Sequence, residues 1–409
     1  MWVCARNTEP PNLKMELHLP YPLLSQLRVE AREAPASGIV AVMNHGRMKD
    51  GIIPLWAGEG DLSTPDFIRN AGIEALRNGE TFYTWQRGIP ELRHALARYH
   101  KRHFDREFSH DQFLVTGSGM QSIQLAIQAI AGHGDEVLYI SPSWPNFAAA
   151  AEIAGARAIA VPLDFGGNGW SFDVLKLEAN ISKSTKAIFV NSPSNPTGWT
   201  ADKDTLAHIL AFSRKHGLWI IADEIYNLFH YNGDRAASFM DIMDADDRII
   251  FVNSFSKNWA MTGWRVGWLT IHPSLAPVFE NLIQYSTSGV AQFMQRAAVV
   301  ALDQGDAFIT MQVQRAQAAR DILCKMLLDT GRVRLSPPDG AFYLFFAVDG
   351  IKDSMRAALS IVEEANVGLA PGIAFGASAE GFFRVCFNRK LDDVSLAAER
   401  LSNWIKSAK

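Results

Sequence analysis

The segment IIFVNSFSKNWAMTGWRVG, residues 249–267, places a single lysine just behind an apolar run. The run is β-branched and short, which is typical of a buried strand. Lys257 is therefore expected just past a strand end, where a dry crevice favours the neutral, nucleophilic amine. Ser254, Ser256 and Arg265 offer the hydroxyl groups and N–H donors that suit a phosphate dianion. Together they indicate pyridoxal phosphate, although this segment alone also fits a solvated loop lysine.

Seven short apolar runs, this one included, alternate with segments of helical periodicity. The alternation predicts an α/β fold with a mostly parallel sheet of about seven strands and flanking helices. Ligands bind such sheets beyond the carboxyl ends of the strands, so the residues after each run are candidates for a site. The runs are QFLVT (112–116), EVLYIS (136–141), RAIAVP (157–162), TKAIFVN (185–191), LWIIAD (218–223), IIFVNS (249–254) and VGWLTI (266–271).

The two ends of the chain have a different character. Residues 1–36 carry several prolines and predict an extended N-terminal arm, of the kind that packs on a partner subunit. Ser37 is expected to cap a helix that runs to Met48. Helices dominate after about residue 281, with strands expected at 341–347 and 382–387. These patterns predict a large cofactor-binding domain over 61–280 and a smaller α+β domain made of 37–60 and 281–409.

Composition narrows the classes of function. The chain has 409 residues, 48% of them hydrophobic, which is enough for two domains. Its net charge of -4 with mixed signs argues against binding nucleic acid or an anionic membrane. The three cysteines are scattered, which argues against disulfides and thiolate metal sites. We therefore expect the protein to be located in the reducing cytoplasm. We also see no export signal and no apolar stretch of roughly 18 residues that would span a membrane.

Three loops that follow other apolar runs carry groups suited to a phosphate or a flat ring. The stretch GSGM, residues 117–120, opens a helix whose free N–H groups attract an anion, although many such loops are only helix starts. Trp144 stands between two prolines and either stacks on a ring or packs in the core. Asn195 follows a proline-rich stretch and either begins a turn or donates its amide to a phenolate oxygen.

Two charged residues are expected in apolar surroundings. Asp223 ends the run LWIIAD, and a buried carboxylate needs a partner. A pyridinium nitrogen is such a partner, and Tyr226 nearby can donate to the ring oxygen. A Mg²⁺ ligand is the rival interpretation of Asp223, but the chain has no GxxxxGK[ST] loop. Arg384, in the apolar run FFRV, is expected to meet either a substrate α-carboxylate or a structural salt bridge.

Four motifs, in this order and at these spacings, carry a family resemblance: NPTG (195–198), ADEIY (222–226), SFSK (254–257) and TGWRVG (262–267). With them the chain resembles the class I/II aminotransferases of the fold-type-I pyridoxal-phosphate enzymes, from about residue 37 to the C-terminus. The resemblance implies that Lys257 is the Schiff-base lysine and proton shuttle. It also implies that the active sites are shared across a homodimer.

The resemblance assigns further roles residue by residue. Asp223 pairs with the pyridine nitrogen, Tyr226 and Asn195 contact the ring oxygen, and Trp144 stacks on the ring. Arg384 binds the α-carboxylate, with Gly58, Asn195 and Trp144 beside the substrate. The phosphate is held by Ser118, Gly119, Ser254, Ser256 and Arg265, and by Tyr83 of YTWQRG (83–88) from the neighbouring subunit. Met120 is a further cofactor-binding residue.

Departures from the family pattern point to the substrate. Aspartate-type members carry an arginine or a lysine where this chain has Leu282 or Met120. Because both expected cations are replaced by apolar residues, we predict a neutral, apolar or aromatic amino donor. Three further aromatic residues are candidates for the pocket lining, and two arginines are candidates for a displaced cation. These are Trp56, Trp85 and Tyr285, and Arg47 and Arg87.

The predicted reaction is ping-pong transamination between an amino acid and a 2-oxo acid, with Lys257 moving the proton. Three alternatives stay open from the residues. The first is a C–S β-lyase with the same cofactor, and the second is an aspartate-type aminotransferase with a displaced distal cation. The third is an effector-binding regulator, which would need a basic helix-turn-helix extension, and residues 1–36 are too short and proline-broken for one.

Overall fold

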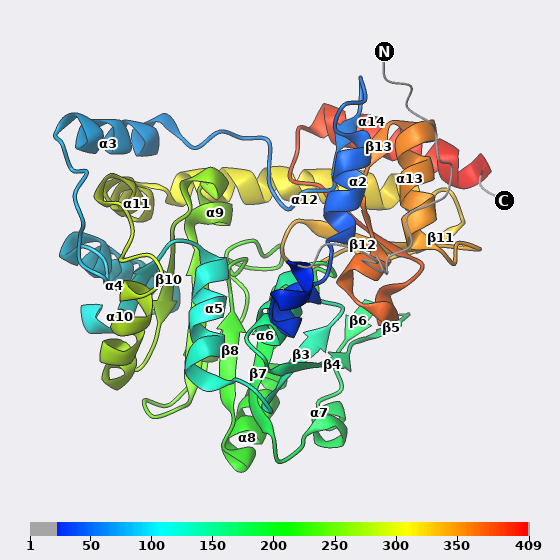
Figure 1. The fold of residues 1–409 in the computed structure, drawn as a ribbon. Helices are drawn as coiled ribbons and strands as arrows, with labels where there is room; N and C mark the ends of the chain where they lie inside the picture. Colours follow the sequence, from blue (N-terminus) through cyan, green and yellow to red (C-terminus); the bar gives the residue numbers. More distant parts are fainter. Residues whose placement is uncertain (1–22, 168, 408–409) are drawn as a thin grey trace.

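The computed structural model describes residues 23–167 and 169–407. In Figure 1 the strands of a large sheet fill the lower half, and the long helix α12 (Asp306–Leu328) crosses above them. Helix α12 ends in a second region, at the upper right, where α2 (Gly38–Gly46), α13 (Ser354–Ala365) and α14 (Leu391–Ser407) lie. The N-terminal arm predicted over 1–36 lies partly outside the described residues. Its described part holds only a 3₁₀ turn, Leu24–Gln26, and the short helix α1, Val29–Arg32.

The large sheet has seven strands in the order β2-β10-β9-β8-β7-β3-β4. All pairs are parallel except those of β10, which runs antiparallel to both β2 and β9. Each of the seven apolar runs forms one strand, so the predicted mostly parallel sheet is confirmed. The strands are β2 Phe113–Thr116, β3 Glu136–Ser141, β4 Arg157–Pro162, β7 Thr185–Asn191, β8 Trp219–Asp223, β9 Ile249–Ser254 and β10 Gly267–Thr270.

Helices cover both faces of this sheet, which explains why its central strands are apolar throughout. One face packs on Ile123 of α5 and Phe147 of α6, and the other on Leu96 of α4 and Ile209 of α8. Capping side chains fix where helices begin, as where Asp202 Oδ1 accepts from the Thr205 N–H at 2.7 Å. The helices of this part are α3 Asp66–Arg77, α4 Pro90–Phe104, α5 Gly119–Ile130, α6 Pro145–Ile153, α7 Leu175–Asn180, α8 Lys203–His216, α9 Phe255–Asn258, α10 Ala276–Gln284 and α11 Gln292–Gln304.

The second region is built on a four-stranded antiparallel sheet of order β11-β12-β15-β14. Ser37 caps α2, as predicted, by accepting the Val40 N–H at 3.3 Å. The remaining elements are α2 Gly38–Gly46, α13 Ser354–Ala365, α14 Leu391–Ser407, β1 Ile53–Pro54, β5 Asp164–Gly166, β6 Gly169–Ser171, β11 Val333–Arg334, β12 Tyr343–Val348, β13 Val367–Gly368, β14 Ala370–Pro371 and β15 Phe382–Cys386.

The apolar core of the large sheet and that of the second region meet along α12. Its Ile309 belongs to the core of the large sheet, whereas Ala316 and later residues belong to the core of the second region. Helix α11 packs on α3 and α4, on the side of the large sheet. The domain boundary near residue 281 therefore stays a prediction, and the change of core lies further along the chain. Among the described residues, no helix is long and apolar enough to cross a membrane.

Candidate active site

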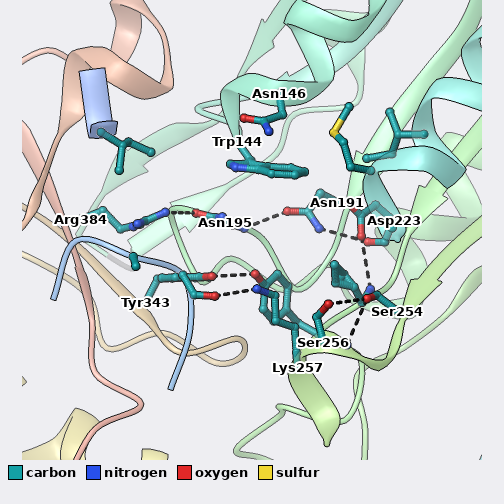
Figure 2. Close-up of a pocket in the computed structure, with 18 of the residues that line it drawn as sticks. Trp144, Asn146, Asn191, Asn195, Asp223, Ser254, Ser256, Lys257, Tyr343 and Arg384 are labelled. Atoms are coloured by element: carbon teal, nitrogen blue, oxygen red, sulfur yellow. Dashed lines mark hydrogen bonds between the residues drawn. The ribbon is translucent and has the colours of Figure 1, made fainter. Parts of the chain in front are cut away.

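A cavity of about 350 Å³ lies where the strand ends of the large sheet face the second region. Figure 2 shows a row of side chains across it, from Arg384 through Asn195 and Asn191 to Asp223, with Trp144 on one side and Lys257 on the other. The parallel strands β7, β8 and β9 deliver their carboxyl ends here, as expected for such a sheet. The second region contributes β12 and β15, together with the segment that follows β1.

Lys257 lies three residues beyond the end of β9, on the short helix α9. Its Nζ donates a hydrogen bond to the backbone oxygen of Gly58 at 2.6 Å. Removal from water lowers the pKa of the Lys257 amine to about 8, and the nearby Arg384 and Arg265 charges act in the same direction. A substantial fraction of the amine is therefore neutral near pH 7.5, as a nucleophile or a base must be.

Asp223, the last residue of β8, is a carboxylate that is 3% exposed. Burial raises its pKa to about 7, an effect that the hydrogen bond from the Ile225 N–H and the charge of Lys257 oppose. Among the described residues, no lysine or arginine forms a salt bridge with it. A buried carboxylate without a cation fits a protonated ring nitrogen of a bound cofactor.

Asn191, at the end of β7, was not singled out from the sequence. Its Nδ2 donates to the backbone oxygen of Asp223 at 3.1 Å, and its Oδ1 accepts the Asn195 N–H at 2.8 Å. Asn191 thus ties two strand ends to each other and fixes the loop that carries Asn195. The signal for it was present, because a polar residue closes the apolar run TKAIFVN.

Two hydrogen bonds and two ring contacts hold the Arg384 side chain of β15. Its Nη1 donates to Asn195 Oδ1 at 3.0 Å, and its Nη2 donates to the backbone oxygen of Trp56. The guanidinium carbon lies 4.7 Å from the ring centre of Tyr343 and 5.0 Å from that of Phe375. The buried Nε–H has no acceptor among the described residues. A rigid, buried cation with a spare donor fits a carboxylate ligand, and no carboxylate within 23–167 and 169–407 forms a salt bridge with it.

Two tyrosine hydroxyl groups meet beside this arginine. Tyr226 Oη and Tyr343 Oη are 2.6 Å apart, and both side chains are buried and line the cavity. Burial raises the pKa of both phenols above their usual value, so both stay protonated. Tyr343 was missed in the sequence because it belongs to an apolar strand and resembles an ordinary core residue.

The expected phosphate site lies at the start of α5. Ser118 caps this helix by accepting the Gln121 N–H at 3.1 Å and does not line the cavity, whereas Gly119, Met120, Ser254, Ser256 and Arg265 do. Arg265 adopts a left-handed backbone conformation with φ 55°, a strained choice for a side chain of its size. Helix N–H groups, two hydroxyls and a guanidinium match a phosphate dianion.

Several candidates from the sequence do not reach the cavity. Tyr83 is 92% exposed and lies outside the lining, as does the exposed Tyr285. Arg87 is paired with Glu280 at 2.7 Å. Neither candidate for a displaced cation, Arg87 or Arg47, lines the cavity, and the same is true of Leu282 and Trp85. Trp56 does line it.

Comparison with known proteins places this fold and cavity in a family. The model of the family "Aminotransferase class I and II" matches residues 50–401. Aspartate aminotransferase from Thermotoga maritima is 32% identical over 88% of this chain and 92% of its own length. A solved structure of aspartate aminotransferase from the same organism has a TM-score of 0.87, with 31% identity over 93% of this chain and 100% of the other.

Other relatives carry different substrate names. A probable aspartate/prephenate aminotransferase from Aquifex aeolicus is 33% identical over 95% of both chains. Aromatic-amino-acid aminotransferase 2 from Thermococcus litoralis is 32% identical over 88% of this chain and 93% of its own length. The family resemblance expected from the four motifs is thus confirmed. The chain belongs to the class I and II aminotransferases and is a transaminase of the family that uses pyridoxal 5'-phosphate.

Proposed function

We propose that this transaminase takes a neutral, apolar or aromatic amino acid as its amino donor and passes the amino group to a 2-oxo acid by a ping-pong mechanism. The observation that carries the proposal is the placement of charge in the cavity. Among the described lining residues the cations are Lys257, Arg265 and Arg384. Each already has a role toward the cofactor or the α-carboxylate, so none remains for a second carboxylate.

The part of the cavity left for the donor side chain is apolar. We call it the apolar wall, and it consists of Ile39, Val40 and Met43 of α2 and Met120 and Ile123 of α5. A carboxylate placed against these side chains would lose water without gaining a partner, which is costly. An aliphatic or aromatic side chain would instead be stabilised by burial, at about 25 cal/mol for each Å² of apolar surface.

The remaining lining residues would hold the cofactor. We propose that Gly119, Ser254, Ser256 and Arg265 hold its phosphate, with Ser118 fixing the helix start and Met120 beside it. Trp144 would stack on the ring, and Tyr226 and Asn195 would contact the ring oxygen. Asp223 would keep the ring nitrogen protonated. The bound cofactor supplies an electron sink for the electrons released when a proton leaves the substrate Cα.

The chain's own groups then bind the substrate and move the proton. We propose that Arg384 holds the α-carboxylate through guanidinium N–H groups that Asn195 and Trp56 do not use, while Gly58 and Trp56 close the cavity beside it. Lys257 would hold the cofactor through its amine, and the free amine would accept the proton that leaves the substrate Cα and release it again. An amine whose pKa is about 8 can both accept and release a proton near neutral pH.

We also propose a homodimer in which Tyr83 reaches the cofactor phosphate of the partner. Phe82, Tyr83 and Tyr285 are 80%, 92% and 88% exposed, an unusual degree for large aromatic side chains. They flank a hollow lined by residues 81–84 and 287–291. A covering second copy would explain this exposure. A cytoplasmic location is supported by Cys324 and Cys386, which are buried and unbridged.

An aspartate-type transaminase is the second candidate, because several relatives carry that name, among them the Thermotoga maritima protein. The two candidates differ in how fast aspartate reacts relative to apolar and aromatic amino acids. The holoprotein is mixed with single amino acids without an oxo acid, and conversion of the cofactor is followed by its absorbance. We expect leucine and phenylalanine to react at least about tenfold faster than aspartate, a difference of about 1.4 kcal/mol. Aspartate reacting fastest would contradict the proposed donor class.

A further inference from the structure

The hydroxyl pair of Tyr226 and Tyr343 joins the two regions of the molecule at the cavity. Tyr226 follows β8 of the large sheet, whereas Tyr343 begins β12 of the second region. The 2.6 Å separation of their oxygens is that of a strong O–H···O hydrogen bond. Figure 2 draws this bond from Tyr343, next to the one that Lys257 makes.

The Tyr343 hydroxyl is confined on its other sides. A Cβ atom built on Gly58 would lie 2.5 Å from the Tyr343 Oη, so only glycine leaves room for this hydroxyl. The ring is fixed from above by the Arg384 guanidinium, and the backbone is fixed by pairing of Tyr343 with Cys386 in β15. Because the ring and backbone are locked, the hydroxyl oxygen has one position.

A count of protons decides what the pair can do. A tyrosine hydroxyl has one proton to donate and two lone pairs to accept with. Among the described residues, the hydrogen bond of Tyr343 Oη is the one with Tyr226. Both tyrosines line the cavity, so a ligand there can accept from the hydroxyl whose proton is not used within the pair. If Tyr343 donates within the pair, the Tyr226 proton remains available to the ligand.

Several charged and titratable groups surround the two tyrosine hydroxyls. Asp223, Arg384 and Lys257 face Tyr226, with Lys257 Nζ 6.0 Å from the centre of its ring. Cys386 also faces Tyr343. Glu59 and Arg265 act on Lys257 from further away. None of these groups forms a hydrogen bond with either tyrosine hydroxyl in the described part of the chain.

We propose that Tyr343 is a positioning residue, which donates its hydroxyl proton to Tyr226 and so directs the Tyr226 proton toward the ring oxygen of the bound cofactor. The inference rests on the proposed role of Tyr226. Hydrogen bonds in a chain polarise one another, so accepting from Tyr343 makes Tyr226 a stronger donor. A stronger donor stabilises negative charge on the ring oxygen. We therefore expect the absorbance of the holoprotein to titrate at a lower pH when both hydroxyls are present.

The test is a pH titration of the absorbance of purified holoprotein. Tyr226→Phe should raise the pH midpoint by roughly 1, the size expected for losing a hydrogen bond to a charged oxygen. Tyr343→Phe, which keeps the ring and removes the hydroxyl, should raise the midpoint by roughly 0.1–0.3, since coupling strengthens a bond by some 10–30%. The double variant should match Tyr226→Phe alone, because Tyr343 acts only through Tyr226.

A matched control is Tyr231→Phe, which removes another buried hydroxyl, one that donates to the Ala341 backbone oxygen outside the cavity. This control should leave the midpoint unchanged. A lower or unchanged midpoint in Tyr343→Phe, or a shift that persists when Tyr226 is already phenylalanine, would overturn the role of Tyr343. An unchanged midpoint in Tyr226→Phe would instead overturn the proposed role of Tyr226.

Discussion

In one part of the cavity every reactive group is held by named partners, whereas the apolar wall is held only by packing. Lys257, Asn195 and Arg384 each form hydrogen bonds that fix their direction. The apolar wall consists of side chains that form no hydrogen bonds, and its Val40 is 48% exposed. The difference suggests a division of labour. In the proposed function, the hydrogen-bonded groups perform a reaction common to all amino acids, and the apolar wall selects among their side chains.

The largest expected effect comes from removing the amine of the reactive lysine. The half-reaction is the transfer of the amino group from the amino acid to the cofactor. Lys257→Ala should lower its rate by at least about 10³-fold, because the nucleophile and the base are lost together. Lys257→Arg keeps the positive charge and should be equally inactive. Rapid-mixing absorbance measurements with single amino acids would show this. A variant that keeps multiple turnovers near the parent rate would contradict the assignment.

A smaller effect is expected at the carboxylate site. Arg384→Gln should lower kcat/KM by roughly 10- to 100-fold for every amino acid alike, since a buried charge-assisted hydrogen bond contributes about 1.5–3 kcal/mol. Arg320→Gln is a matched control. Its guanidinium also stacks on a tyrosine, at 4.5 Å from the Tyr231 ring centre, but lies outside the cavity. Equal losses in both variants would mean that Arg384 is only structural.

Changing the apolar wall should alter selection and leave the reaction itself intact. Met120→Lys adds a cation to the lining, and we expect it to raise the rate with aspartate relative to phenylalanine by about fivefold, as for a partly exposed ion pair of about 1 kcal/mol. Gln128→Lys is the matched control, because it adds the same charge on the exposed face of the same helix. Steady-state kinetics with both donors would compare them. An unchanged ratio in Met120→Lys would place selection elsewhere.

The smallest expected effect concerns stability of the cofactor-free protein. Because burial raises the pKa of Asp223 from 3.8 to about 7, its native state holds a proton more tightly than its unfolded state. Its contribution to stability is therefore complete below about pH 4 and is lost as the pH rises through 7. Asp223→Asn should flatten the fall of Tm between pH 4 and 7 by a few degrees. A parallel pH profile in the variant would contradict this.

The parts of the molecule also differ in how well they can be predicted from the sequence. The seven strands and the residues that follow them could be predicted, because apolar runs and loop motifs are local signals. Tyr343 could not, since its partner Tyr226 lies 117 residues away and nothing in the apolar strand indicates the contact. Asn191 could have been predicted, because it is a polar residue that closes an apolar run, as Asp223 is. Tyr83 stays a prediction, because its proposed partner belongs to a second chain.

The proposed separation of reaction and selection is tested most directly by the ratio of the reaction rates with phenylalanine and aspartate. The measurement compares half-reaction rates for phenylalanine and aspartate in the parent protein and in Arg384→Gln, using the cofactor absorbance. Our account predicts that both rates fall in the variant while their ratio, in favour of phenylalanine, stays the same within about twofold. A ratio that reverses, or that changes as much as the rates do, would show that Arg384 takes part in selecting the side chain.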